Sequence, residues 1–129
     1  MDRNNRFVDK VVIVTGGAVG IGNGAAQAFA REGGSVVIAD IDADKANLAA
    51  NNIVACGGTA IAVATDVRSN AAVANMVETA VATFGGVDVL FNSAGINLYG
   101  TVDNFSEEDW DRQIDVNLKG IFLTCKHVI

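Results

Sequence analysis

Four short apolar runs recur along the chain, each the length of a strand. They consist mainly of Val, Ile and Ala, and apolar and polar positions do not alternate cleanly within them. Runs of this kind are typical of strands that are buried on both faces, as in a parallel sheet. The sequence therefore predicts four strands, at residues 11–14, 35–39, 59–63 and 87–91.

The segments between these runs carry the apolar period of helices that bury one face. The period is clear from 21 to 29 and from 73 to 84, whereas the Ala-rich segment 42–56 has a weaker apolar stripe. A capping box that opens at Ser106 predicts a fourth helix, which continues as far as Cys125.

Glycine pairs mark the ends of the predicted helices. They stand at 33–34, 57–58 and 85–86, directly before the second, third and fourth strands. Because glycine readily adopts the left-handed conformation that closes a last helical turn, each pair predicts a helix end. Ser69 is a suitable N-cap for the third helix.

Strand and helix thus alternate four times, which predicts a parallel sheet with right-handed crossovers and helices on both faces. We expect an α/β fold of the Rossmann type: a doubly wound parallel sheet with strand order 3-2-1-4, truncated after the fourth strand and the fourth helix. No linker or low-complexity tract interrupts the pattern, so residues 1–129 are expected to form one domain, incomplete at its C-terminal side.

Composition narrows the classes of partner. The formal net charge is −6 and no basic stripe is present, so we expect no nucleic-acid partner. No residues have metal-ligand spacing, and Cys56 and Cys125 suggest two buried or half-buried thiols rather than a disulfide framework. The N-terminal residues form no apolar leader, and no apolar run is long enough to cross a bilayer. A cytoplasmic protein with no metal and no membrane partner is therefore expected.

A glycine-rich loop follows the first strand and opens the next helix. Its glycines, Gly16, Gly20 and Gly22, have the spacing G-x-x-x-G-x-G. Glycines at this point allow a tight turn and let the backbone approach a pyrophosphate, which the N-terminus of the following helix attracts. The loop indicates a dinucleotide site, although a purely structural turn can have the same composition.

A carboxylate stands at the end of the second strand. Asp40 can accept hydrogen bonds from the adenosine ribose hydroxyls, and its charge would repel a 2′-phosphate. Ile41 follows it, and Asp42 and Asp44 add negative charge nearby. NAD is therefore favoured over NADP. The alternative is that Asp40 caps the following helix, since Asp is also common at that position.

With these residues in view, the sequence resembles the short-chain dehydrogenase/reductase family. Its stretch Thr15-Gly16-x-x-x-Gly20-Ile21-Gly22 is similar to the family's cofactor fingerprint, and three further motifs follow in the family's order: Asp66-Val67, Asn92-Ser93-Ala94-Gly95 and Asn117. The resemblance implies that Asn117 is a catalytic residue. It implies a set of NAD-binding residues, namely Gly16, Ala18, Val19, Gly20, Ile21, Gly22, Asp40, Ile41, Asp66, Val67, Asn92, Ala94 and Gly95.

The resemblance also implies individual roles. Asp66 would contact the adenine, Asn92 would brace the central sheet, and Asn117 would bend the fourth helix and hold a water in a proton relay. From the residues alone, Asn92 could equally be a turn former. Ser93 replaces the second Asn of the family's motif, a small change because that motif mainly shapes the backbone beside the cofactor.

The implied activity is hydride transfer between the nicotinamide and a small hydroxy or keto substrate. In the family a serine and a Tyr-x-x-x-Lys pair handle the proton, and the lysine charge lowers the tyrosine pKa from about 10. The only tyrosine, Tyr99, is followed four residues later by Asp103 and does not match. We expect these residues to lie beyond Ile129, in a full-length form that is a homo-oligomer. The alternatives are a non-catalytic dinucleotide-binding module and a fragment without function.

Overall fold

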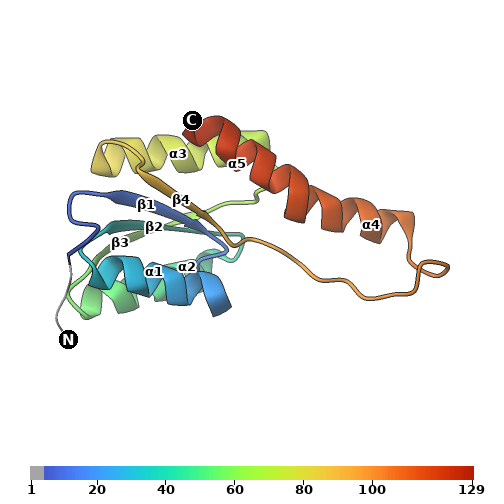
Figure 1. Ribbon diagram of the computed structural model, residues 1–129, viewed down its shortest axis with the longest axis horizontal. Helices are drawn as coiled ribbons and strands as arrows, with labels where there is room; N and C mark the ends of the chain where they lie inside the picture. Colours follow the sequence, from blue (N-terminus) through green and yellow to red (C-terminus); the bar gives the residue numbers. More distant parts are fainter. Residues whose placement is uncertain (1–4) are drawn as a thin grey trace.

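All four predicted strands form, and they lie in a single parallel sheet (Figure 1). The computed structural model describes residues 5–129. The strands run in the order β3-β2-β1-β4, and the register sets Ile13 of β1 beside Val37 of β2 and Leu90 of β4. This confirms the predicted fold class and strand order. The strands are β1 (Val11–Thr15), β2 (Ser35–Asp40), β3 (Thr59–Ala64) and β4 (Val89–Asn92).

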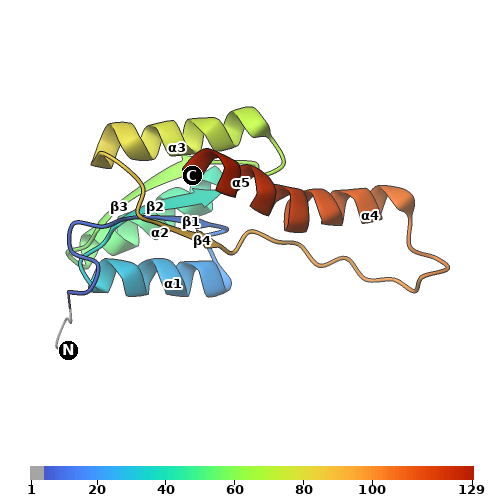
Figure 2. The ribbon, with the colours of Figure 1, turned by 45° about the horizontal axis from the view of Figure 1, so that its top comes forward.

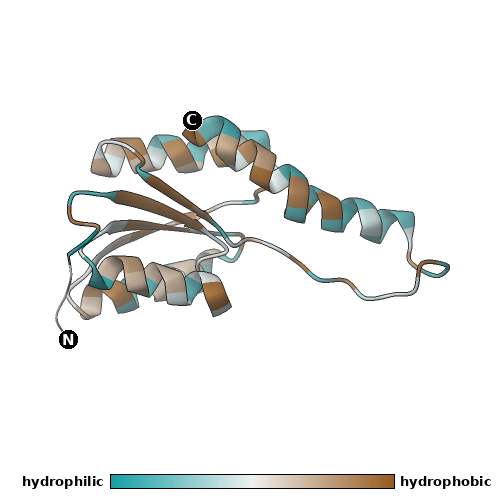
Figure 3. Cartoon of the chain, in the orientation of Figure 1, coloured by the Kyte–Doolittle hydropathy of each residue, from teal (hydrophilic) through white to brown (hydrophobic). Residues whose placement is uncertain are grey.

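Helices cover both faces of the sheet. Figures 1 and 2 show α1 (Gly20–Arg31) and α2 (Ala43–Ala55) on one face, and α3 (Asn70–Phe84) and α5 (Gly120–Val128) on the other. Successive side chains of a strand point to opposite faces, so each strand contributes to two cores. Hydropathy colouring shows these apolar strands between the two helical layers (Figure 3).

The two cores differ in the side chains that the helices supply. On one face Val12 and Ile38 pack against small side chains such as Ala26 of α1 and Ala46 of α2. On the other face Ile13 and Val37 meet larger side chains, including Val73 and Met76 of α3 and Leu123 of α5. Small side chains such as alanine let a helix pack close to a sheet.

The helix ends follow the glycine pairs. Gly33, Gly57 and Gly85, the first glycine of each pair, have positive φ angles of 92°, 85° and 93°. These are left-handed conformations, which a residue with a Cβ adopts at a cost. The predicted helix ends are therefore confirmed, as are the N-caps: Ser69 accepts a hydrogen bond from the Ala72 N–H, and Ser106 accepts one from the Asp109 N–H.

The fourth strand begins later than predicted. Val87 and Asp88 precede β4 because Asp88 uses its side chain where a strand would use its backbone. One carboxylate oxygen accepts from the Val11 N–H at 2.8 Å, and the Asp88 N–H donates to the Val11 carbonyl at 2.9 Å. The regular ladder with β1 then starts at Val89.

The predicted fourth helix is also interrupted. It forms as α4 (Glu107–Ile114), a π-helical segment η1 (Asp115–Lys119), and α5. The Gly120 N–H bonds to the Asp115 carbonyl, five residues earlier. Residues 93–106 form no helix or strand, and Figures 1 and 2 show this segment and α4 reaching away from the sheet.

The two cysteines differ in exposure. Cys56 and Cys125 are both free thiols, but Cys56 is exposed, so the expectation that it is buried or half-buried is wrong. It stands at the C-cap of α2, on the solvent side of the turn.

Within residues 5–129, no helix is long and apolar enough to cross a membrane.

The packing of α3 can be tested with two equal substitutions. Val73 is fully buried and Val81 is 46% exposed on the same helix. We expect Val73→Ala to lower the free energy of unfolding by about 1–3 kcal/mol, and Val81→Ala to change it by less than about 0.5 kcal/mol. Urea unfolding measures both. Because helix propensity changes equally in the two variants, equal effects would contradict the assigned packing.

Candidate functional site

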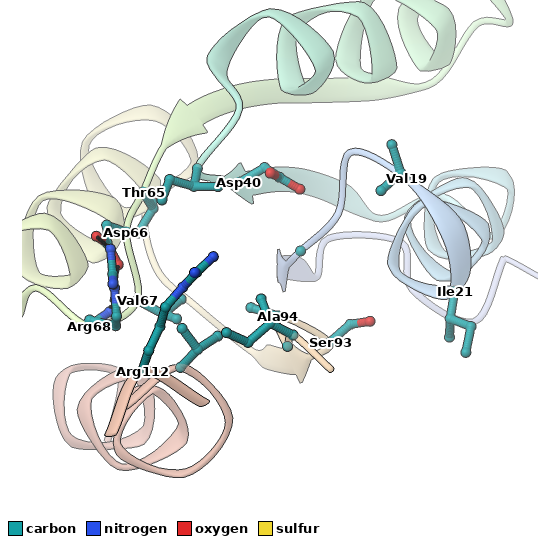
Figure 4. A pocket seen from close by; sticks show the side chains of 15 residues that line it. Val19, Ile21, Asp40, Thr65, Asp66, Val67, Arg68, Ser93, Ala94 and Arg112 are labelled. Atoms are coloured by element: carbon teal, nitrogen blue, oxygen red, sulfur yellow. Dashed lines mark hydrogen bonds and ion pairs between the residues drawn. The ribbon is translucent and has the colours of Figure 1, made fainter. Parts of the chain in front are cut away.

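A cavity of about 470 Å³ opens at the carboxyl ends of the strands (Figure 4). Open α/β sheets bind ligands at this edge, where crossovers diverge to opposite faces. Here the divergence falls between β1 and β4. The lining residues come from the end of β2, the loops after the four strands, the first turn of α1, and α4 with η1: Gly16, Val19, Ile21, Asp40, Ile41, Thr65, Asp66, Val67, Arg68, Ser93, Ala94, Gly95, Ile96, Arg112 and Val116.

The structure gathers most of the expected site residues at this cavity. The expected residues among its lining are Gly16, Val19, Ile21, Asp40, Ile41, Asp66, Val67, Ala94 and Gly95. The remaining expected residues, Ala18, Gly20, Gly22, Asn92 and Asn117, are not part of the lining and lie in the elements that shape it. The binding and catalytic roles of both groups stay predictions.

Glycines in the loop after β1 allow backbone to pack directly on backbone. Gly16 has φ +62°, and a Cβ there would come within 2.8 Å of the Ala94 Cα. A Cβ on Gly22 would overlap the Gly16 carbonyl oxygen. The loops after β1 and β4 and the first turn of α1 are thereby held together at the cavity's edge.

The start of α1 has the features of an anion-binding helix N-terminus. Its N-cap, Val19, is extended, no described side chain accepts from its first N–H groups, and its first turn contains no acidic residue. The starts of α2, α3 and α4 differ, because Asp42, Ser69 and Ser106 cap them. The first turn of an α-helix has N–H groups without intrahelical partners, and the dipole makes this end positive. A phosphate group fits that environment.

Asp40 joins the end of β2 to the glycine loop. One of its carboxylate oxygens accepts from the Ala18 N–H and the other from the Asp42 N–H, each at 3.1 Å. The N-cap of α2 is Asp42, whose side chain accepts from the Lys45 N–H, so the alternative of Asp40 as that cap is wrong. A carboxylate oxygen has two lone pairs, and Asp40 can therefore accept further bonds from the cavity.

Asp66 is paired with a cation that sequence reasoning did not single out. Arg68 donates to both carboxylate oxygens, from Nε at 3.0 Å and from a terminal nitrogen at 2.8 Å. This bidentate pair holds the pKa of Asp66 below its usual range, although partial burial opposes the shift. Arg112 of α4 also lines the cavity, and Figure 4 shows its side chain pointing into it. Neither arginine belongs to a recognisable spacing pattern, so no local signal marks them.

The buried hydroxyl of Thr15 connects β1 to the chain after β4. Its oxygen accepts from the Ser93 N–H at 3.1 Å and the Ala94 N–H at 3.2 Å, and it donates to Asn92 Oδ1 at 3.4 Å. Asn92 Oδ1 also accepts from the Thr124 hydroxyl at 2.8 Å. The Asn92 amide therefore links β1, β4 and α5 from beside the cavity.

Asn117 lies in the π-helical turn and binds the chain that leaves β4. Its Oδ1 accepts from the Ile96 N–H and its Nδ2 donates to the Ile96 carbonyl, both at 2.8 Å. Asn117 thus fixes the backbone next to Gly95, which lines the cavity. The wider helical turn around it is of a kind that is frequent at functional sites.

Apolar side chains at the cavity are left open to solvent. Val19, Ile21 and Ile41 are 57%, 82% and 67% exposed. Uncovered apolar side chains that surround convergent polar groups are typical of ligand sites, because a ligand covers them on binding. The cavity therefore combines the start of α1, which has no side-chain cap, with carboxylates and apolar side chains in one groove.

Comparison with known proteins places the chain in a family. A family model described as short chain dehydrogenase matches residues 10–129. The chain belongs to the short-chain dehydrogenase family. The predicted family resemblance is thereby confirmed.

Similar proteins support this assignment. A (2S)-[(R)-hydroxy(phenyl)methyl]succinyl-CoA dehydrogenase subunit from Thauera aromatica is 40% identical over 93% of this chain and 48% of its own length. Galactitol 2-dehydrogenase from Agrobacterium fabrum is 42% identical over 95% of the chain and 47% of its own length. A crystal structure of a short chain dehydrogenase from Mycobacterium avium has a TM-score of 0.90 at 43% identity, covering 94% of this chain and 45% of that one.

This short-chain dehydrogenase chain spans about half the length of the curated relatives it matches. Relatives that carry an activity in their names include dehydrogenases and reductases. All the residues that line the cavity lie within the matched residues 10–129.

The contact between Gly22 and Gly16 can be tested against a second glycine of α1. Gly22→Ala should lower the free energy of unfolding by about 1–3 kcal/mol, because the new Cβ meets a backbone carbonyl that cannot move freely. A Cβ on Gly24 would meet no atom within 4 Å. Gly24→Ala should therefore raise the free energy of unfolding by about 0.5–1 kcal/mol. A Gly22→Ala protein as stable as the native one in urea would disprove the contact.

The Arg68–Asp66 pair makes a prediction about pH. The pKa of Asp66 is lower in the folded protein than in the unfolded chain. The pair therefore stabilises the fold at pH values above the pKa of Asp66 in the unfolded chain. This stabilisation is lost as the pH falls through the pKa of Asp66 in the folded protein. Arg68→Gln should raise the pKa of Asp66 toward the ordinary value of an aspartate. A carbon-13 NMR titration of the carboxyl groups measures this.

Asp103 is the internal control for that titration. Its pKa is lowered by a hydrogen bond from Thr101 and not by an arginine, so it should not move in Arg68→Gln. An unchanged Asp66 pKa in the variant would show that Arg68 is not the cause of the shift.

Proposed function

We propose that this chain is the NAD-binding part of an oxidoreductase that transfers hydride between the nicotinamide and a small hydroxy or keto substrate. The observation that carries the proposal is the placement of the Asp40 carboxylate in the cavity wall, tied to the loop that opens the uncapped helix α1. The dehydrogenase names of the relatives support the reaction class.

The expected cofactor contacts divide along the cavity. The pyrophosphate would lie at the start of α1, on the N–H groups that follow Val19. The adenosine ribose would donate to Asp40, and the adenine would lie between Ile41 and Val67. Asp66, held as an anion by Arg68, would accept from the adenine amino group.

Preference for NAD over NADP follows from charge. A 2′-phosphate on the adenosine ribose would face Asp40, and repulsion between like charges in a partly buried site is costly. Arg68 offers little compensation, because Asp66 already neutralises it. Arg112 reaches into the cavity from α4, across from Asp40 (Figure 4).

The nicotinamide supplies the hydride acceptor or donor, and this chain supplies the shape around it. Asn117 holds Ile96, and thereby the wall beside Gly95, at a defined distance from the glycine loop. Tyr99 is 88% exposed, and its hydroxyl accepts from Asn97; it does not stand in the Tyr-x-x-x-Lys pattern. Proton transfer is therefore not assigned to a residue of this chain, beyond the relay role predicted for Asn117.

Two expectations about the whole protein stay predictions: its homo-oligomeric assembly and its cytoplasmic location. A non-catalytic dinucleotide-binding module would use the same cavity. The dehydrogenase names of the relatives favour the enzyme.

The assignment of Asp40 is tested by cofactor preference. In Asp40→Ser, NADH affinity should fall roughly ten- to a hundredfold, since a hydrogen bond to a charged group is lost. NADPH affinity should rise or stay equal, because the repulsion is removed. Fluorescence titration with both nucleotides measures the ratio.

Asp44→Ser is the matched control. Asp44 is exposed in the first turn of α2 and does not line the cavity, so solvent and salt screen its charge. This variant should change the ratio of NADH to NADPH affinity far less than Asp40→Ser does. The Asp40 assignment fails if the two variants change that ratio equally.

A further inference from the structure

Two side chains of one helix hold the segment that leaves β4. The Leu98 N–H donates to Gln113 Oε1 at 2.6 Å, and Ile96 exchanges two hydrogen bonds with the Asn117 amide, each at 2.8 Å. We propose that Gln113 is a positioning residue: together with Asn117 it keeps residues 96–98 extended and so shapes the nicotinamide end of the cavity. The proposal rests on the proposed function, because it assumes that the cavity holds NAD.

The spacing of the two amides matches an extended chain. Residues four apart in a helix are separated by about 6.0 Å along its axis, and residues two apart in an extended chain by about 6.6 Å. Gln113 and Asn117 can therefore meet the alternate N–H groups of Leu98 and Ile96, with the segment running opposite to the helix. The helix takes the place of a neighbouring strand.

Burial along the segment has the same period. Ile96 and Leu98 are half-buried, whereas Asn97 and Tyr99 are exposed. This alternation is characteristic of an extended chain that presents one side to a neighbour. Residues 93–106 contain no strand, so the two amides supply the hydrogen bonds that a sheet would otherwise provide.

The π-helical turn improves the alignment. In an α-helix, residues four apart are offset by about 40° around the axis. Asn117 lies in the wider turn that the bond from the Gly120 N–H to the Asp115 carbonyl closes, and a wider turn reduces this offset. Both amides can then face the same extended segment.

Residues 96–98 lie beside the cavity, so the hydrogen bonds from Gln113 and Asn117 should affect ligand binding. β4 lies on the opposite side of β1 from β2 and β3. With the adenosine at Asp40, on the β2 side, a dinucleotide that crosses the switch point carries its nicotinamide half toward β4. Ile96, the residue next to the cavity's Gly95, lines that half. Loss of the Gln113 bond should loosen this wall and leave the adenosine side unchanged.

The test exploits the single atom that Gln113 uses. Gln113→Met keeps the length of the side chain and removes the acceptor oxygen, whereas Gln113→Glu keeps an acceptor in the same place. The affinities for NADH and for ADP are measured, together with the hydrogen exchange of the Leu98 amide. ADP contains the adenosine and pyrophosphate groups and lacks the nicotinamide half. Lys119→Met, an exposed replacement on the same helix, is the control.

We expect Gln113→Met to weaken NADH binding roughly five- to tenfold, the effect of one hydrogen bond, with ADP binding unchanged. The Leu98 amide should exchange faster in this variant by a similar factor. Gln113→Glu and Lys119→Met should resemble the native chain. A purely structural role would weaken NADH and ADP equally, and that result would overturn the proposal.

Failure of the proposed function is a separate result. If the native chain binds neither NADH nor ADP, the cavity is not a dinucleotide site, and the nicotinamide part of the inference falls with it. Hydrogen exchange of the Leu98 amide still tests the contact with Gln113. An unchanged exchange rate in Gln113→Met would show that Gln113 does not hold residues 96–98.

Discussion

At the carboxyl end of β1, the backbones of two loops and one helix pack together with no side chain between them. Gly16 lies against Ala94, and the first turn of α1 lies against Gly16 through Gly22. Close-packed interiors leave no room for even one added carbon at such contacts. The start of α1, the glycine loop and the chain after β4 are placed by this contact, and the cavity is the space that remains beside it.

Polar side chains complete what the glycines begin. Asp40 ties β2 to the glycine loop, the Thr15 hydroxyl ties β1 to the chain after β4, and Asn117 ties that chain to the helix beyond. Each contact satisfies backbone N–H groups that lie outside regular structure, which would be costly to leave unpaired where solvent is excluded. The loops around the cavity are thus ordered by the protein before any ligand arrives, and binding need not bear the entropy of ordering them.

The charges along the cavity are also arranged by contacts within the protein. The chain is acidic as a whole, with a formal net charge of −6, yet Arg68 and Arg112 line the groove. Arg68 is neutralised by Asp66, and the start of α1 contributes positive potential without a charged side chain. A site for a dinucleotide pyrophosphate can therefore exist in an acidic domain of the short-chain dehydrogenase family.

The amino-acid sequence alone determined the strands, the helices and their glycine ends, because burial period and backbone conformation are local properties. It also pointed to the glycine loop and to Asp40, whose positions at strand ends follow from the alternation of strands and helices. Tertiary structure decided the rest. It showed that Asp42 and not Asp40 caps α2, that Asp88 delays β4, that Arg68 binds Asp66, and that Gln113 holds Leu98. Two of these contacts join distant residues: Asp88 and Val11 are 77 positions apart, and Gln113 and Leu98 are 15 apart. The other two, Asp42 with Lys45 and Arg68 with Asp66, are local and form in the turns after β2 and β3. For the distant contacts, which side chain meets which backbone group depends on how the elements pack, and no local pattern of residues contains that information.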